Sequence, residues 1–98
     1  MSVTEMRIDK WLWHARFYRS RPLAQEAAAS GMIRVNGNRI AKSSATVTPG
    51  DVITLPRGRD VLAVRVQALA SRRGPASEAL RLYEVIADTT LDPAAPPP

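Results

Sequence analysis

The chain has 98 residues, the usual size of one domain, and a formal net charge of +5 at pH 7. It has no cysteine and one histidine, which excludes disulfide bridges, thiolate metal sites and sites with several histidines. No apolar run is long enough to span a bilayer, and residues 1–6 lack the basic and apolar segments of a secretory signal. We therefore expect a cytoplasmic protein with no membrane partner.

The positive charge is concentrated in the first part of the chain. Residues 1–59 hold ten basic and four acidic side chains, a net charge of +6. Residues 60–98 hold four basic and five acidic side chains, a net charge of −1. A one-sided basic distribution is typical of a protein that binds nucleic acid.

The first predicted helix spans residues 8–18. Ile8, Trp11, Leu12 and Ala15 have the spacing of one apolar helix face, so Trp11 is assigned to the core. A different strip of the same helix carries basic side chains, which we expect to be presented together: Arg7, Lys10 and His14.

The second predicted helix spans residues 22–30. Ser20 is the expected N-cap, Arg21 lies at the boundary, and Pro22 suits the first helical turn. Gly31 is expected to end the helix in a left-handed conformation.

Strands are predicted after the two helices. Residues 32–35 form a short strand, and Asn36-Gly37 is a strong signal for a two-residue hairpin because both residues tolerate positive φ. The return begins at residues 39–40, residues 42–45 are a polar connection, and Pro49-Gly50 is a turn. Residues 51–55 and 61–69 are further strands, joined by a turn at 57–60.

The segment after the loop at 71–75 has two readings. Its apolar residues fit a helix face, and some of them also alternate as in a strand, with residues 85–86 extended. The start at Pro75 favours the helix.

The domain expectation is a flexible N-terminus at 1–6, one domain at 7–90 and a disordered proline-rich tail at 91–98. The fold expected is α+β: two packed helices lie on a small, strongly bent antiparallel sheet, and a C-terminal helical or extended segment closes the core.

Several short motifs resemble the RNA-binding domain named after small-subunit ribosomal protein S-four, also called the alpha-L motif, over a core of about residues 7–55. They are Arg7-Ile8-Asp9-Lys10, Ser20-Arg21, Ala24, Gly31, Ile33, Val35-Asn36-Gly37 and Pro49-Gly50-Asp51. Residues 10–13, 15–18, 75–79 and 82–84 resemble the bacterial ribosome-associated heat-shock protein family of about fifteen kilodaltons. Longer members of that family carry a basic C-terminal extension, whereas this chain ends in a proline-rich segment without basic residues.

The resemblance implies a non-catalytic RNA-binding protein that acts in stress response and ribosome quality control. The implied partners are large-subunit rRNA, tRNA and the free large ribosomal subunit that holds a stalled nascent chain. We expect a monomer without metal or cofactor. An accessory module for RNA modification and a helix-turn-helix-like DNA-binding protein are the alternatives, and weak DNA binding is left open.

The candidate RNA-binding residues are mostly basic side chains that can contact phosphate, together with polar and glycine positions near them. Asp9 is expected to be structural, because a carboxylate repels phosphate. No nucleophile and base are arranged for catalysis. The candidates are Arg7, Lys10, His14, Arg16, Arg19, Ser20, Arg21, Gln25, Arg34, Asn36, Gly37, Arg39 and Lys42.

Overall fold

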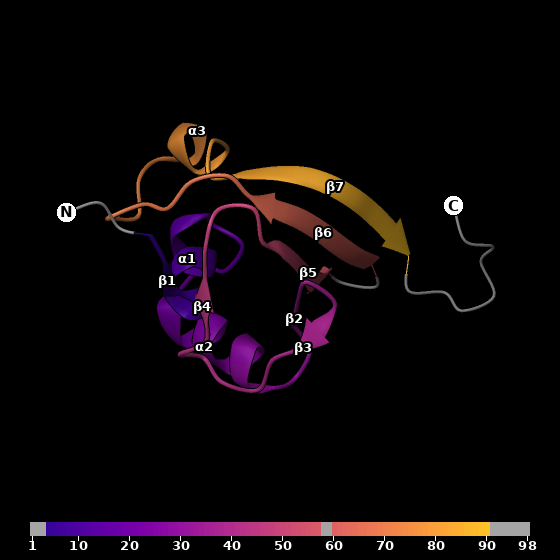
Figure 1. Ribbon diagram of the computed structural model, residues 1–98. Coiled ribbons are helices and arrows are strands. Elements are labelled where there is room, and N and C mark those ends of the chain that lie inside the picture. The colour runs from indigo at the N-terminus through magenta and orange to yellow at the C-terminus, as the bar shows by residue number, and fades with distance from the viewer. Residues whose placement is uncertain (1–3, 58–59, 91–98) are drawn as a thin grey trace.

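The computed structural model describes residues 4–57 and 60–90 of the chain. Within these residues, two helices and a one-turn helix combine with two antiparallel sheets, as expected for an α+β fold (Figure 1). The elements in chain order are β1 (Met6–Arg7), α1 (Ile8–His14), α2 (Arg21–Ala29), β2 (Arg34–Val35), β3 (Asn38–Arg39), β4 (Thr46–Val47), β5 (Val52–Arg57), β6 (Asp60–Val66), α3 (Ala76–Ala79) and β7 (Tyr83–Thr90).

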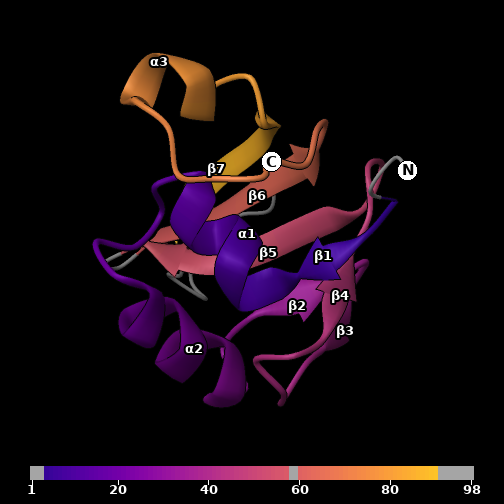
Figure 2. The same cartoon turned by 90° about the vertical axis from the view of Figure 1, so that its left-hand side faces the viewer.

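The larger sheet has the strand order β3-β2-β5-β6-β7, and all its neighbours are antiparallel. Helices α1 and α2 pack against each other and lie on the same side of this sheet (Figure 2). The apolar stripe predicted for the first helix forms the centre of the core, where Trp11 and Leu12 are fully buried. The indole Nε1 of Trp11 donates a hydrogen bond of 3.0 Å to the carbonyl oxygen of Ala68, which ties α1 to the chain after β6.

The predicted cap and turns of the second helix and the hairpin are confirmed. The Ser20 hydroxyl accepts a hydrogen bond of 3.3 Å from the backbone N–H of Leu23. Gly31 adopts φ +82°, which ends α2 in the left-handed region. Asn36 and Gly37 have φ values of 53° and 84°, the two positive angles that a tight β2–β3 hairpin needs.

The first helix is shorter than predicted, because it ends at His14 instead of residue 18. The backbone N–H of Arg16 bonds to the carbonyl of Trp13, and that of Phe17 bonds to the carbonyl of Leu12. This pair of bonds is a Schellman motif, which requires a left-handed residue after the cap. Arg16 fills that position with φ 66°, where glycine is the usual residue. The end of the helix was missed because no glycine marks it.

The helix predicted from Pro75 is also too long. Only one turn forms, and the chain becomes β7 at Tyr83. β7 pairs with β6 along its length, and this pairing satisfies backbone groups that a longer helix would leave exposed at the sheet edge. The apolar residues of this segment fit both a helical and a strand period, and pairing with β6 selects the strand.

The last residues of the predicted flexible N-terminus at 1–6 are held against β4, and residues 1–3 lie outside the described residues. Met6 lies opposite Val47, and the Thr48 hydroxyl donates to the carbonyl of Thr4. The predicted tail at 91–98 and the middle of the turn at 57–60 lie outside the described residues.

His14 is buried, with 2% of its surface exposed, so the prediction that it joins the exposed basic strip was wrong. Its Nδ1 lies 3.0 Å from the carbonyl oxygen of Ala70, which can only accept, so Nδ1 carries the proton. Burial lowers the pKa of His14 below 6.5, and the nearby charges of Lys10, Arg21 and Arg73 lower it further, although the Ala70 carbonyl opposes the shift.

The burial of a neutral imidazole predicts an acid-sensitive fold. Below pH 6.5 the unfolded chain binds a proton at His14 that the folded chain does not, so the free energy of unfolding decreases as pH falls. Chemical denaturation at about pH 7.5 and about pH 5 should show this decrease, at most about 1.4 kcal/mol per pH unit for one proton. In His14→Asn, whose amide can still donate to Ala70, the decrease should be smaller. An equal decrease in both proteins would contradict the assignment.

Candidate nucleic-acid interface

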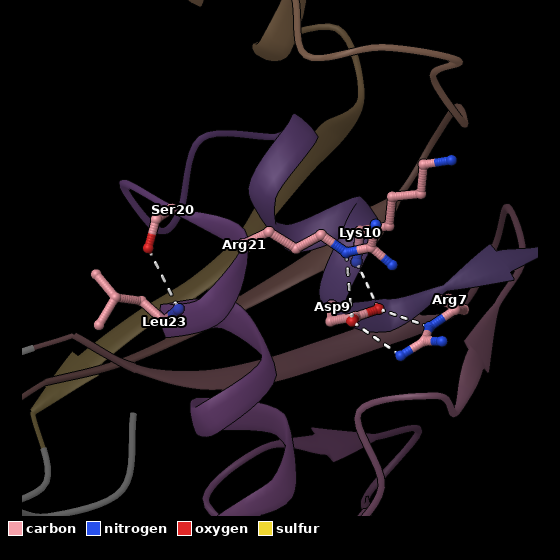
Figure 3. Close-up of polar contacts among 6 residues, drawn as sticks. All are labelled: Arg7, Asp9, Lys10, Ser20, Arg21 and Leu23. Carbon is pink, nitrogen blue, oxygen red and sulfur yellow. Dashed lines mark hydrogen bonds and ion pairs between the residues drawn. The ribbon is translucent and has the colours of Figure 1, made fainter.

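A buried carboxylate organises the basic residues at the start of both helices (Figure 3). Asp9 has no exposed surface. The Arg7 guanidinium donates to both of its oxygens, with Nε–Oδ1 and Nη2–Oδ2 distances of 3.1 Å. The backbone N–H of Lys10 donates to Oδ1 at 2.8 Å. The expectation that Asp9 is structural is therefore correct.

Arg21 joins the same carboxylate from the second helix. Its Nε lies 3.6 Å from Oδ2 of Asp9, which is an ion pair but too long for a good hydrogen bond. That Nε is buried and has no hydrogen-bond partner among the described residues. Asp9 thus joins β1, α1 and the first residue of α2, and it fixes the directions of two guanidinium groups.

Asp9 is held in its charged form. Burial alone would raise the pKa of Asp9, but hydrogen bonds from Arg7, the Lys10 backbone and Gln25, with the charge of Arg7, lower it below 3.8. The carboxylate therefore remains an anchor for the two arginines throughout the neutral range.

The other face of this cluster is open to solvent. The side chains of Arg7 and Arg21 are 44% and 37% exposed, although both are paired with Asp9. The ammonium group of Lys10 extends away from the carboxylate in Figure 3. We call Arg7, Lys10 and Arg21 the basic cluster. Its three positive charges exceed the buried negative charge of Asp9 by two, so a ligand in solvent meets a positive surface.

Four further candidates lie in the loop between α1 and α2 or on α2. Arg19 is exposed in the loop before α2, and Ser20 is the helix cap. Gln25 is half-buried beside Asp9. The Arg16 side chain is exposed, and its Nε donates to the carbonyl of Gly74 at 2.9 Å.

The candidates on the hairpin form a separate group, and no described contact joins them to Asp9. The Asn36 amide donates to Asp51, and its oxygen accepts from the backbone N–H of Val52, so this side chain braces the hairpin. Arg34 donates to the carbonyl of Gly37 at 3.3 Å. The exposed members of this group are Arg34, Asn36, Gly37, Arg39 and Lys42.

Arg73 has a structural role that the sequence did not predict. Its partner Trp13 lies 60 residues away in the chain, and sequence spacing gives no signal for so distant a contact. Its Nε donates to the carbonyl of Trp13 at 3.1 Å, and its guanidinium lies 5.6 Å from the centre of the Trp13 ring. Together with the bond from Arg16 to Gly74, this contact clamps the loop between α1 and α2.

No group of three metal-binding side chains occurs in residues 4–57 and 60–90. In the same residues, each helix is too short or too polar to cross a bilayer.

The first half of the chain matches a known domain family. The S4 domain family matches residues 6–53, which contain the basic cluster and the hairpin. Heat shock protein 15 of Escherichia coli K12 is 46% identical over 87 residues, a match that covers 89% of this chain and 65% of that protein. This chain therefore spans just under two thirds of the length of that relative.

Two further relatives match over most of their own length. The RQC P-site tRNA stabilizing factor of Bacillus subtilis 168 is 37% identical, and the match covers 88% of this chain and 98% of that protein. The solved structure of Vibrio cholerae heat shock protein 15, described as trimeric, has a TM-score of 0.79 and 42% identity, covering 85% of this chain and 83% of that one. The fold, the motifs and these matches show that the chain belongs to the S4-domain family that includes heat shock protein 15 and the RQC P-site tRNA stabilizing factor.

Proposed function

We propose that this protein binds the free large ribosomal subunit through its rRNA and the peptidyl-tRNA, and that it acts without catalysis in the rescue or recycling of stalled subunits after stress. The observation that carries the proposal is the basic cluster, in which a buried Asp9 holds two half-exposed guanidinium groups at the start of the helix pair. Relatives named for heat shock and for the stabilisation of P-site tRNA support the choice of partner.

The basic cluster is better suited to contact the phosphates of an RNA backbone than to distinguish one base sequence from another. Arginine donates in a fixed planar fork that matches phosphate oxygens, and Asp9 orients two such forks before any ligand arrives. Preorganised groups lose less conformational entropy on binding. Contacts of this kind position a folded RNA through shape and charge, and they make its affinity strongly salt-dependent.

The arrangement also bears on the alternatives. An accessory module for RNA modification would use the same basic cluster, so it differs from our proposal in its partner and not in its chemistry. A helix-turn-helix protein would present its second helix to a DNA groove, whereas here the start of α2 is engaged by Asp9. Competition among duplex DNA, tRNA and structured rRNA separates these readings. We also propose that the protein is cytoplasmic and monomeric, and sedimentation of the free protein tests the monomeric state.

Charge reversal at Lys10 tests the proposal. Lys10→Glu places a carboxylate where a phosphate is expected, so affinity for large subunits that carry peptidyl-tRNA should fall by about tenfold or more. Co-sedimentation and RNA titration over a range of salt measure this loss, and the salt dependence should decrease as well. Arg21→Glu is a poorer choice because it would place a second carboxylate beside Asp9.

Arg81→Glu is the matched control, because it reverses one charge in the same way as Lys10→Glu. Arg81 is exposed between α3 and β7 and is far along the chain from the basic cluster. It should bind nearly as the unaltered protein does. Equal losses in the two variants would show that only net charge matters and would remove the basic cluster from the proposal. Equal binding of subunits with and without peptidyl-tRNA would refute the rescue role while leaving RNA binding intact.

The buried carboxylate makes a separate prediction about stability. Asp9→Asn keeps the shape of the side chain but removes the charge that pairs with the two arginines. Because both arginines are more than one third exposed, we expect a modest loss of about 1–3 kcal/mol at neutral pH.

The effect of this substitution should depend on pH. The pKa of Asp9 is lowered by folding, so its contribution is present above pH 3.8 and is lost as pH falls through the folded-state value. The stabilities of the two proteins should therefore approach each other as pH falls below 3.8, which chemical denaturation at a series of acid pH values measures. A difference that stays constant from neutral to acid pH would contradict the role given to the charge.

A further inference from the structure

A groove of about 450 Å³ lies between the loop after α1 and the long strands of the sheet. Arg16 and Phe17 line it from the loop, Leu55 and Leu62 from β5 and β6, and Tyr83 and Val85 from β7. This volume falls within the range of roughly 300–1,000 Å³ that small-ligand sites occupy in proteins. Most of the described residues that line it have apolar or aromatic side chains and Arg16 is cationic, while polar atoms make up more of the exposed lining than apolar atoms do. Apart from Arg16, none of these residues is among the RNA-binding candidates described above.

Arg16 stands where local backbone physics favours glycine. It occupies the left-handed position of the Schellman motif, with φ 66°, and a residue with a Cβ is strained there. Its side chain has one specific partner, the carbonyl of Gly74, which accepts from Nε at 2.9 Å. This bond steers the guanidinium from the loop toward residues 71–75 while the side chain lines the groove. Strain of this kind at a groove wall is typical of functional positions.

Aromatic and apolar side chains line the rest of the groove. The rings of Phe17 and Tyr83 lie 4.6 Å apart between centroids, at an angle of 49°. Val85 lines the groove with 53% of its surface exposed, and the next residue, Ile86, is 44% exposed. A shift in register opposite Ala63 and Val64 interrupts the pairing here, and such bulges often lie next to binding sites because they redirect side chains.

We propose that this groove takes an unstacked nucleobase from the RNA that the basic cluster holds, an inference that rests on the proposed function. Aromatic rings and an arginine plane are the surfaces on which proteins stack bases drawn out of single-stranded RNA. The positive charge of Arg16 suits a nucleotide better than an apolar peptide. One short loop carries both Arg16 and Phe17 of the groove and Arg19 and Ser20 before α2, so the groove and the first residues of the α2 cap are neighbours along the chain.

The test compares two substitutions that add the same charge. Val85→Lys fills the groove with a long side chain and adds a positive charge, which by charge alone would strengthen RNA binding. Leu80→Lys adds the same charge at a residue that is 64% exposed and does not line the groove. Both sites are exposed, so circular dichroism and thermal melting should show intact folds.

The probes are RNA hairpins with a short single-stranded overhang that carries either normal bases or abasic sugars. The unaltered protein should bind the overhang with bases about tenfold more tightly than the abasic one. Val85→Lys should lose that preference, and Leu80→Lys should keep it. A fluorescent adenine analogue in the overhang should lose emission on binding in the unaltered protein and in Leu80→Lys, but not in Val85→Lys.

Each other outcome has a distinct meaning. If the unaltered protein binds both overhangs equally, or if the two lysine variants behave alike, the base pocket is refuted while RNA binding stands. If the unaltered protein binds no hairpin, tRNA or subunit, the proposed function itself fails. If Val85→Lys weakens association with large subunits and leaves every RNA affinity at the level of Leu80→Lys, the groove takes a protein side chain and the base pocket is refuted.

Discussion

The ion pairs of the buried Asp9 carboxylate are the constraint on which the N-terminal half of the structure depends. A carboxylate without exposed surface is stable in a protein only when it is paired and hydrogen-bonded. Asp9 meets that requirement with Arg7 from β1, Arg21 from α2 and the backbone of its own helix. One side chain therefore sets how three elements meet, and the same contacts leave two guanidinium groups half-exposed on the outer surface.

The C-terminal half holds the first helix from its other side. Trp11 and His14 bond to the carbonyls of Ala68 and Ala70, and Arg73 donates to the carbonyl of Trp13. These partners lie beyond residue 53, where the match to the S4 domain ends. The added strands and loop are thus a brace for α1 and the loop that follows it. This role explains how residues 60–98, which have a net charge of −1, contribute to a basic surface without carrying its charge.

The features that the sequence predicted are those with a local cause. Ser20 as a cap and Asn36-Gly37 as a turn are fixed by neighbouring residues, so their patterns can be read directly. Features decided by distant partners could not be read in this way. The end of α1 lacks its usual glycine because Arg16 stands there, and β7 forms because β6 offers a free edge.

The candidate site also has features that the local sequence predicts and features that distant contacts decide. The basic residues of the first helix were predicted from composition and spacing, but their shared carboxylate and the burial of His14 were not. A helical strip defined by 3.6-residue periodicity places a side chain on a face of its own helix, and it does not show which other segments cover that face. Residues 68–74 cover the end of α1, which removes His14 from the surface.

The central claim is that Asp9 positions the basic cluster for RNA, and the affinity of Asp9→Asn for large-subunit rRNA or tRNA tests it most directly. The substitution makes the protein more positive by one charge at neutral pH, so charge alone predicts tighter binding. If Asp9 orients Arg7 and Arg21, the folded variant should bind more weakly than the unaltered protein at every salt concentration. Tighter binding by the folded variant would contradict the account.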